Sequence, residues 1–393
     1  MTDTNHDFDG VVILADESAN WRIGGLRQLE RLILALNEFA EAAEYQHEIG
    51  VVVFWEPKIP PNERWLPDNS RLVLIRPVGL AGSLEAGTYL LTTRLFVARN
   101  GEFFQTAPAM KIEQSVELST EGWRKLWDQW KTIDIDAKEE RGWRILKHAG
   151  DTGKAEQQLL RRTGKTQDGF VSRFINRPIS RFITRGLLKF PITPSAWTLS
   201  MLVLPVIAFF FLAHGDYAGF VIGTALFQIA NILDGCDGEI ARAKYLESER
   251  GRRLDSLCDL ITNLIFVLCL GVGLFRQAGS VGPWRSIYLV ESIISCLLIG
   301  ARLAGYAAEL VARDTTRPVS RRDEQSILDS SQRLFGGTLT AFLFQLTKRD
   351  VIFFGFFLLA IAGVASWILH LVFIFSVVTL FLRLKDAGAA RAR

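Results

Sequence analysis

The sequence has few cysteines, and none of them has the spacing of zinc ligands. It also lacks an excess of charge: the net charge is +3, which gives no case for a nucleic-acid partner. The N-terminal stretch MTDTNHDFDG has neither a basic nor an apolar region, so we expect no signal peptide. All four cysteines lie in the second half of the chain, where small buried residues in a reducing setting are expected. They are Cys236, Cys258, Cys269 and Cys296.

Apolar residues are abundant but unevenly distributed. They make up 49% of the 393 residues, and phenylalanine alone occurs 27 times, which is high for a soluble protein. Up to about Leu188, charged residues recur every few positions. After Pro191, long apolar runs are separated by short polar loops. This change predicts a soluble domain followed by a membrane domain.

The first part of the chain has the pattern of an α/β domain. Continuous apolar runs at 11–15, 49–55 and 71–77 predict buried strands. A helical period of leucines over 24–43 predicts an amphipathic helix between the first two strands. The order strand, helix, strand favours a mostly parallel sheet. We therefore expect a soluble α/β domain over 1–133, with linking helices over 134–167.

A basic amphipathic helix is predicted over 168–190, just before the apolar half. Arginines and a lysine step every four residues along one side, and apolar residues line the other. The basic positions are Arg173, Arg177, Arg181, Arg185 and Lys189. Such a helix is typical of one that lies in the membrane interface on anionic headgroups. The alternative is an ordinary surface helix of the soluble domain.

Six apolar segments are candidates for membrane-spanning helices, although the last two are weakly separated. They are 196–213, 218–240, 256–275, 284–308, 350–367 and 369–383. Basic residues gather after the second, fourth and sixth segments, which predicts that these loops face the cytoplasm. We therefore expect a six-helix membrane domain over 191–393, in a multi-pass protein of the cytoplasmic (inner) membrane. The soluble domain and both termini would lie on the cytoplasmic side.

An acidic stretch joins the second and third of these segments. On the first of its two helices, two aspartates share a face that small residues and an arginine continue. On the second helix, a glycine and two aspartates step by four. These residues are Asp234, Asp237, Gly238, Ala241 and Arg242 on the first helix, and Gly251, Asp255 and Asp259 on the second. Because the helices are consecutive, they can be antiparallel neighbours and bring four carboxylates together.

Four bare carboxylates in one partly desolvated volume would repel one another and take up protons. Divalent cations remove this conflict, and an all-oxygen ligand set favours Mg²⁺ or Mn²⁺ over zinc. We expect two such ions. Arg242 could hold further phosphate charge, and Gly238 and Ala241 leave the helix face bare for a flat ligand such as a nucleobase. The pattern indicates phosphoryl transfer from a diphosphate. The alternatives are a solvated loop and a calcium loop, but the stretch lacks the alternating oxygen ligands of the latter.

The spacing DxxDGxxAR followed by GxxxDxxxD resembles the signature of the CDP-alcohol phosphotransferase (CDP-alcohol phosphatidyltransferase) family. The resemblance extends more loosely over 168–385, and it implies an interfacial helix followed by six transmembrane helices. The stretch 191–194 is similar to the family's Pro-x-Thr-Pro element, although Ser195 stands where many members have asparagine. Members of the family are commonly homodimers.

The resemblance implies a role for each matched residue. Asp234, Asp237 and Asp255 would be metal ligands, and Asp259 would touch the metal site and act as general base, so that Asp255 and Asp259 form the catalytic pair. The CDP moiety would be bound by Gly238, Ala241, Arg242 and Gly251. An acceptor alcohol would attack the phosphorus of a CDP-linked donor and CMP would leave. At least one of the two alcohols would be a lipid, as in phospholipid biosynthesis, with CDP-diacylglycerol or a soluble CDP-alcohol as the donor.

The opening of the soluble domain is similar to a sugar-phosphate nucleotidyltransferase domain, which is fused to this membrane domain in inositol-phosphate-handling members of the family. Here the Gly-rich loop is replaced by Asp16-Glu17-Ser18-Ala19-Asn20-Trp21, whose acidic residues would repel phosphate. Thr92, Thr93 and Arg94 stand where a metal-binding aspartate is expected. We therefore expect an inactive domain that serves as a scaffold. The alternative is a bifunctional enzyme that still makes its own CDP-alcohol.

A cation transporter is a further alternative, in which the aspartates line an ion path. Glu291 and Arg302, within the fourth apolar segment, are its best support. Arg302 and the basic stretch around Arg317–Arg322 would also suit a phosphorylated acceptor.

Overall fold

The computed structural model describes residues 10–45, 47–62, 65–79, 83–99, 104, 111–132, 142–162, 169–279, 283–311 and 348–391. The chain divides into two compact units. The first comprises Met1–Gly164, Arg185–Pro191 and Arg242–Leu246. The second comprises Lys165–Thr184, Ile192–Ala241 and Glu247–Arg393.

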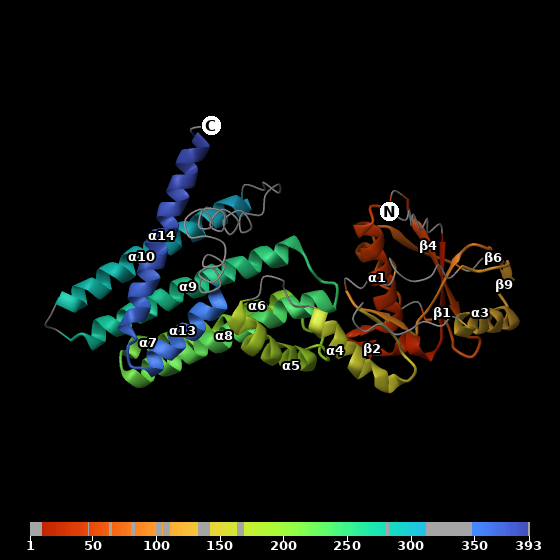
Figure 1. The fold of residues 1–393 in the computed structure, drawn as a ribbon, viewed down its shortest axis with the longest axis horizontal. Coiled ribbons are helices and arrows are strands. Elements are labelled where there is room, and N and C mark those ends of the chain that lie inside the picture. The colour runs from red at the N-terminus through yellow and green to blue at the C-terminus, as the bar shows by residue number, and fades with distance from the viewer. Residues whose placement is uncertain are drawn as a thin grey trace. The chain divides into compact units, whose positions relative to one another are not determined.

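The first unit is built on a four-stranded parallel sheet (Figure 1). Its strand order is β5 (Ile75–Val78), β4 (Ile49–Trp55), β1 (Gly10–Ala15) and β7 (Tyr89–Thr92). The central strand β1 is inaccessible to solvent from Val11 to Ala15, as the continuous apolar run predicts. The expected α/β domain with a parallel sheet is confirmed.

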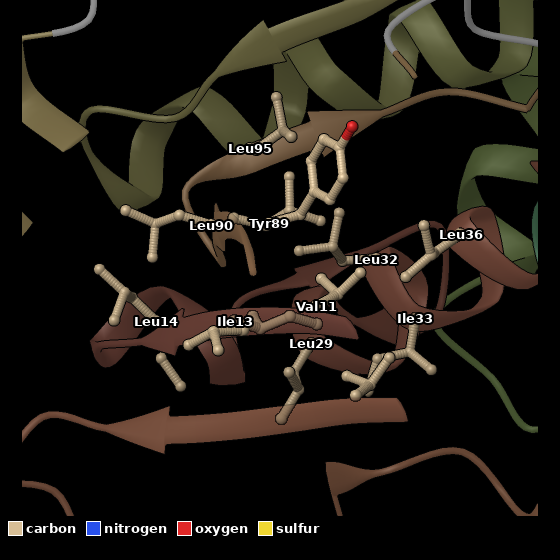
Figure 2. Close-up of a cluster of buried hydrophobic side chains, with 14 of the residues drawn as sticks. Val11, Ile13, Leu14, Leu29, Leu32, Ile33, Leu36, Tyr89, Leu90 and Leu95 are labelled. Carbon is tan, nitrogen blue, oxygen red and sulfur yellow. The ribbon is translucent and has the colours of Figure 1, made fainter. Parts of the chain in front are cut away.

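Helix α1 (Gln28–Ala42) supplies the apolar face that covers this sheet. Leu29, Leu32, Ile33 and Leu36 recur at helical spacing and are almost completely buried. Figure 2 shows their side chains among those of β1 and the Tyr89–Leu95 region. The core of this unit therefore forms where the leucine-rich period of the sequence predicts it.

Shorter elements complete the first unit. They are β2 (Arg22–Ile23) with β3 (Leu26–Arg27), β6 (Ser83–Leu84) with β9 (Val116–Glu117), β8 (Leu95–Val97) with β10 (Trp143–Ile145), and the helices α3 (Thr120–Thr132) and α4 (Thr152–Arg162). Its described residues also form the 3₁₀ turns η1 (Glu17–Asn20), η3 (Asn69–Arg71) and η5 (Ala149–Asp151). Because β10 pairs with β8, residues after 141 contribute to the sheet structure of this unit.

The second unit is helical, although its helices α5 and α8 end in residues of the first unit. Its elements are the π-helical turn η6 (Ser172–Asn176), α5 (Arg177–Leu187), α6 (Pro194–Met201), α7 (Val203–His214), α8 (Tyr217–Ala243), α9 (Glu249–Gln277), α10 (Pro283–Val311), α13 (Arg349–Ile361) and α14 (Ser366–Arg391). Helix α9 packs against α7 and α10, and α10 packs against α14 (Figure 1).

Four segments of the described chain are long and apolar enough to cross a membrane. They are Pro194–His214, Tyr217–Ala243, Glu249–Gln277 and Pro283–Ala308. Ser366–Phe381 is apolar but shorter. The chain is thus a multi-pass membrane protein by the length and composition of its helices, while the count of six spans stays a prediction.

Local capping fixes where several of these helices begin. The Thr193 side chain accepts a hydrogen bond from Ala196 N, and Pro194 occupies the first turn of α6. Ser248 caps α9 in the same way, because its hydroxyl accepts from Gly251 N at 3.0 Å. Gly215, at φ 85°, lies in the left-handed region between α7 and α8. The starts of α6 and α9 and the junction between α7 and α8 are therefore set by local sequence.

The α7–α9 contact depends on a glycine. A Cβ added at Gly273 would lie 2.0 Å from the Leu212 carbonyl oxygen, so the two backbones approach more closely than alanine permits. We expect Gly273→Ala to destabilise the unit by about 1–3 kcal/mol, the usual cost of overpacking, which would appear as a lower Tm in detergent. Gly300→Ala is the matched control, since a Cβ there meets nothing within 4 Å. Equal Tm values for the two variants would contradict the prediction.

Candidate active site

Three aspartates from two neighbouring helices converge in the second unit. Asp234 and Asp237 lie near the C-terminal end of α8, and Asp255 lies in the second turn of α9. One carboxylate oxygen from each lies within 4.8 Å of the others. All three side chains are half-buried. Helical phase predicts this convergence, and the structure shows it for these three residues.

The fourth carboxylate, Asp259, joins the group through an arginine. Arg349, the first residue of α13, forms an ion pair with Asp259 and places its Nη1 3.4 Å from an Asp234 oxygen. In the sequence, Arg349 is one of several basic residues between the fourth and fifth apolar segments, and nothing local distinguishes it from the others. The structure therefore adds one cation to the predicted site.

A cluster of phenylalanines holds α8, α9 and α13 together next to the acids. Phe227 lies about two turns before Asp234 on α8, and Phe266 lies two turns after Asp259 on α9. Their ring centroids are 4.8 Å apart, and the ring of Phe353 lies 5.5 Å from that of Phe266. This buried packing fixes the distance between the helices and so the separation of their carboxylates.

Helix α6 supports the cluster from another side. The Thr198 hydroxyl lies 2.6 Å from an Asp237 carboxylate oxygen and can donate to it. The Trp197 indole N–H donates to the Leu233 carbonyl at 2.9 Å. Hydrogen bonds of this kind orient a carboxylate ligand. Thr198 is a second residue of the site that no local sequence pattern predicts.

The donor set fits a hard divalent cation. Three carboxylates at this spacing supply only oxygen, which suits Mg²⁺ or Mn²⁺ better than zinc. The acids are half-buried and close together, so without a counter-charge they would repel one another strongly. Arg349 supplies part of that charge, and Asp234, Asp237 and Asp255 are the residues that would hold a metal.

The residues predicted to bind CDP lie on the same two helices. Gly238, Ala241 and Arg242 follow the first aspartates along α8, and Ala241 is buried while Arg242 is half-buried. Gly251 lies in the first turn of α9, next to its cap Ser248. Their role in binding a nucleotide stays a prediction.

The two ionisable residues that would support a transporter differ in their surroundings in the structure. Glu291 on α10 is paired with His370 on α14, with a carboxylate oxygen 2.7 Å from His370 Nδ1. It therefore links two helices of the bundle. Arg302 is exposed on α10. The basic stretch Arg317–Arg322 lies outside the described residues.

The basic side of the helix before the first span is not uniformly exposed. Arg177 is buried and forms an ion pair with Glu239 of α8 at 3.1 Å. The prediction that Arg177 lies with the other basic residues on the side facing the headgroups is therefore wrong. Arg173 and Arg185 are exposed, and so are Phe174 and Phe182 on the apolar side. An exposed apolar side suits a helix at a membrane interface, which stays a prediction.

In the first unit, the carboxyl ends of β1 and β7 meet because the two strands are parallel neighbours. Ligands of α/β sheets commonly bind at such an edge. Here Asp16 is buried and accepts hydrogen bonds from Ser18 N at 2.9 Å and from Arg94 Nε at 2.5 Å. The Arg94 guanidinium also lies against the rings of Trp21 and Trp127. The protein's own side chains thus occupy this position with an internal ion pair.

A helical unit with apolar helices of membrane-spanning length and a carboxylate cluster on two consecutive helices is an arrangement that suits a metal-dependent membrane transferase. Residues 192–378 match the family model of CDP-alcohol phosphatidyltransferase. This part of the chain is therefore a CDP-alcohol phosphatidyltransferase domain, and the family predicted from the aspartate motif is confirmed. For this domain, the predicted enzyme class, a CDP-alcohol phosphotransferase, is also confirmed.

Several curated proteins named bifunctional IPC transferase and DIPP synthase are similar to the chain. The Archaeoglobus fulgidus protein is 31% identical over 194 residues, which is 48% of this chain and 35% of that protein. The Rubrobacter xylanophilus protein is 38% identical over 142 residues, or 36% and 32% of the two chains. The Aquifex aeolicus protein is 28% identical over 239 residues, or 59% and 52%. The matches thus cover about a third to a half of the relatives' length.

Proposed function

We propose that the chain transfers a phospho-alcohol group from a CDP-linked donor to an acceptor alcohol and releases CMP. The observation that carries this proposal is the convergence of Asp234, Asp237 and Asp255 within 4.8 Å, with Asp259 joined to the group by Arg349. A metal bound there would neutralise charge on the diphosphate and on the departing CMP.

The chain's own residues take up the proton of the acceptor hydroxyl and bind the CDP moiety. The acceptor hydroxyl oxygen forms a bond to the donor phosphorus, and the bond from that phosphorus to the CMP oxygen breaks. Asp259 takes the hydroxyl proton, and CMP leaves with the bonding electrons. Gly238, Ala241, Arg242 and Gly251 bind the CDP moiety.

The substrates and setting belong to the same proposal. At least one alcohol is a lipid, because the site lies at the ends of apolar helices that can span a bilayer. The site and the soluble domain face the cytoplasm at the inner membrane, where the basic loops are expected. The role is in phospholipid or related lipid biosynthesis, and the protein acts as a homodimer.

The test is CMP release by the purified full chain in detergent. CDP-diacylglycerol and a soluble CDP-alcohol are offered in turn as donors, each with phosphorylated and unphosphorylated acceptor alcohols. The proposal requires acceptor-dependent CMP release with at least one pair. A transporter would instead carry cations across proteoliposomes without any CDP compound, and Glu291, its best support, pairs within the bundle.

We further propose that the soluble domain is catalytically inactive. Its support is the Asp16–Arg94 ion pair at the carboxyl end of β1, in the segment that replaces the Gly-rich loop, because a buried carboxylate there would repel a triphosphate. The full chain with Asp259→Asn, which silences the membrane domain, is expected to release no pyrophosphate from CTP and a sugar or polyol phosphate. Pyrophosphate release above the no-enzyme rate would support the bifunctional alternative, in line with the names of the relatives.

A further inference from the structure

The turn of α8 that carries the aspartates has a second face with its own contacts. Asp234 and Asp237 converge with Asp255, while Gly235, Cys236 and Glu239 lie on the reverse side of the helix. The Cys236 thiol donates to the Ser180 carbonyl at 3.6 Å. A Cβ added at Gly235 would lie 3.1 Å from Arg177 Nη1. The reverse face is therefore fitted closely to the segment Ser172–Thr184.

Glu239 is the centre of this contact and is inaccessible to solvent. One of its oxygens accepts from Arg177 Nη1 at 3.1 Å and from the Ser180 hydroxyl at 2.8 Å. The other accepts from the Thr184 hydroxyl at 2.8 Å. Arg177, Ser180 and Thr184 share one helix face because they are spaced by three and four. We call these four residues the Glu239 cluster.

A buried ion pair of this kind is a poor source of net stability, since desolvation offsets much of the attraction. It is, however, directional, because both oxygens of Glu239 and three donors must be in place together. A rotation of α8 about its axis would break these bonds. The same rotation would carry Asp234 and Asp237 away from Asp255.

A second contact ties the same segment to the acids. Ser172 N donates to Asp350 at the start of α13, and the preceding residue, Arg349, forms the ion pairs with Asp234 and Asp259. The segment Ser172–Thr184 is thus connected to the acidic cluster at both of its ends. One connection runs through the reverse face of α8 and the other through α13.

We propose that the Glu239 cluster is a set of positioning residues that fixes the rotation of α8 and so holds the two α8 carboxylates in the geometry needed for a divalent cation. This inference rests on the proposed function for its metal site. It assigns a role to Glu239, Arg177, Ser180 and Thr184, which bond to one another on the face of α8 opposite Asp234 and Asp237.

Mn²⁺ binding to the purified full chain, measured by electron paramagnetic resonance, tests the proposal without reference to turnover. Glu239→Gln and Arg177→Met are each expected to weaken Mn²⁺ binding by about tenfold, because a displacement of Asp234 and Asp237 from Asp255 should cost as much affinity as the loss of a group that orients a ligand. Both variants should also have a lower Tm. Thr184→Val, which removes one donor, should give a smaller weakening and remain folded.

The double variant Arg177→Met/Glu239→Leu separates positioning from stability. Removing both partners of a buried pair commonly restores stability, and Ser180 and Thr184 can then bond to their own helix. We expect its Tm to recover while Mn²⁺ binding stays weak. If Mn²⁺ binding recovers with Tm, or if no variant changes it, the proposal is overturned.

Glu291→Gln is the matched control, because it breaks another carboxylate pair in the same unit, Glu291–His370. It should lower Tm without changing Mn²⁺ affinity, and an equal loss of affinity in this control would also overturn the positioning role. Failure of the wild-type chain to bind Mn²⁺ would overturn the metal site of the proposed function itself, and the positioning role with it.

Discussion

Asp259→Asn is expected to lower CMP release by a factor of about 10²–10⁴, the usual contribution of a positioned general base. An amide has nearly the same size as the carboxylate but cannot accept the proton of the acceptor hydroxyl. The change also removes the charge that pairs with Arg349. The measurement is the rate of CMP release in detergent at saturating donor and acceptor.

The matched control is Asp216→Asn, just before α8. Asp216 accepts from Gly219 N at 2.8 Å and so has a local structural role at the opposite end of the helix from Asp234. Its variant should keep CMP release within a factor of a few of the wild type. Asp255→Asn should lose activity as Asp259→Asn does. If both active-site variants retain wild-type CMP release, the mechanism proposed above is wrong.

Removal of divalent cations is expected to reduce CMP release to the background rate. Without a counter-ion, Asp234, Asp237 and Asp255 would repel a diphosphate instead of binding it. After treatment with EDTA and dialysis, Mg²⁺ or Mn²⁺ should restore the rate fully. Zn²⁺ should restore it poorly, because the ligand set contains only hard oxygen atoms.

The variant Asp237→Asn provides the accompanying control. It should raise the Mg²⁺ concentration needed for half-maximal CMP release by at least tenfold, since loss of even an outer-shell partner costs about 10–100-fold in metal affinity. Thr198→Val should have a weaker effect of the same kind, because Thr198 lies within hydrogen-bonding distance of Asp237. Full activity in the presence of excess chelator would exclude a metal-dependent reaction.

The features that the sequence predicts well are those that depend on the spacing of residues along a single helix or strand. Helical spacing alone places Asp234 with Asp237, and the short connection between two consecutive helices brings Asp255 beside them. The same holds for β1 and β4, whose apolar runs coincide with strands Gly10–Ala15 and Ile49–Trp55.

Where local signals compete, the boundaries shift. An apolar run at 71–77 predicts a strand, but β5 begins only at Ile75. The Asp68 side chain accepts from Ser70 N at 3.2 Å and turns the preceding residues into the 3₁₀ turn Asn69–Arg71. Likewise, one expected span at 196–213 consists of two helices, α6 and α7, that meet at Leu202.

The features that the sequence does not predict are contacts between distant segments. Arg177 belongs to a four-residue repeat that looks the same whether its members face solvent or the protein. Only the position of Glu239, 62 residues later, makes Arg177 a buried partner. Arg349 is likewise one of many basic residues near apolar runs until α13 packs beside α8 and α9.

The late position of Arg349 in the chain has a consequence for biosynthesis. Arg349 follows Asp259 by 90 residues and Asp234 by 115. A ribosome therefore delivers all four carboxylates to the membrane well before it makes the arginine that pairs with two of them. During that interval the nascent chain carries an acidic cluster without this partner. The contacts of Arg349 with Asp234 and Asp259 are therefore formed late in biosynthesis, after α8 and α9 have been made.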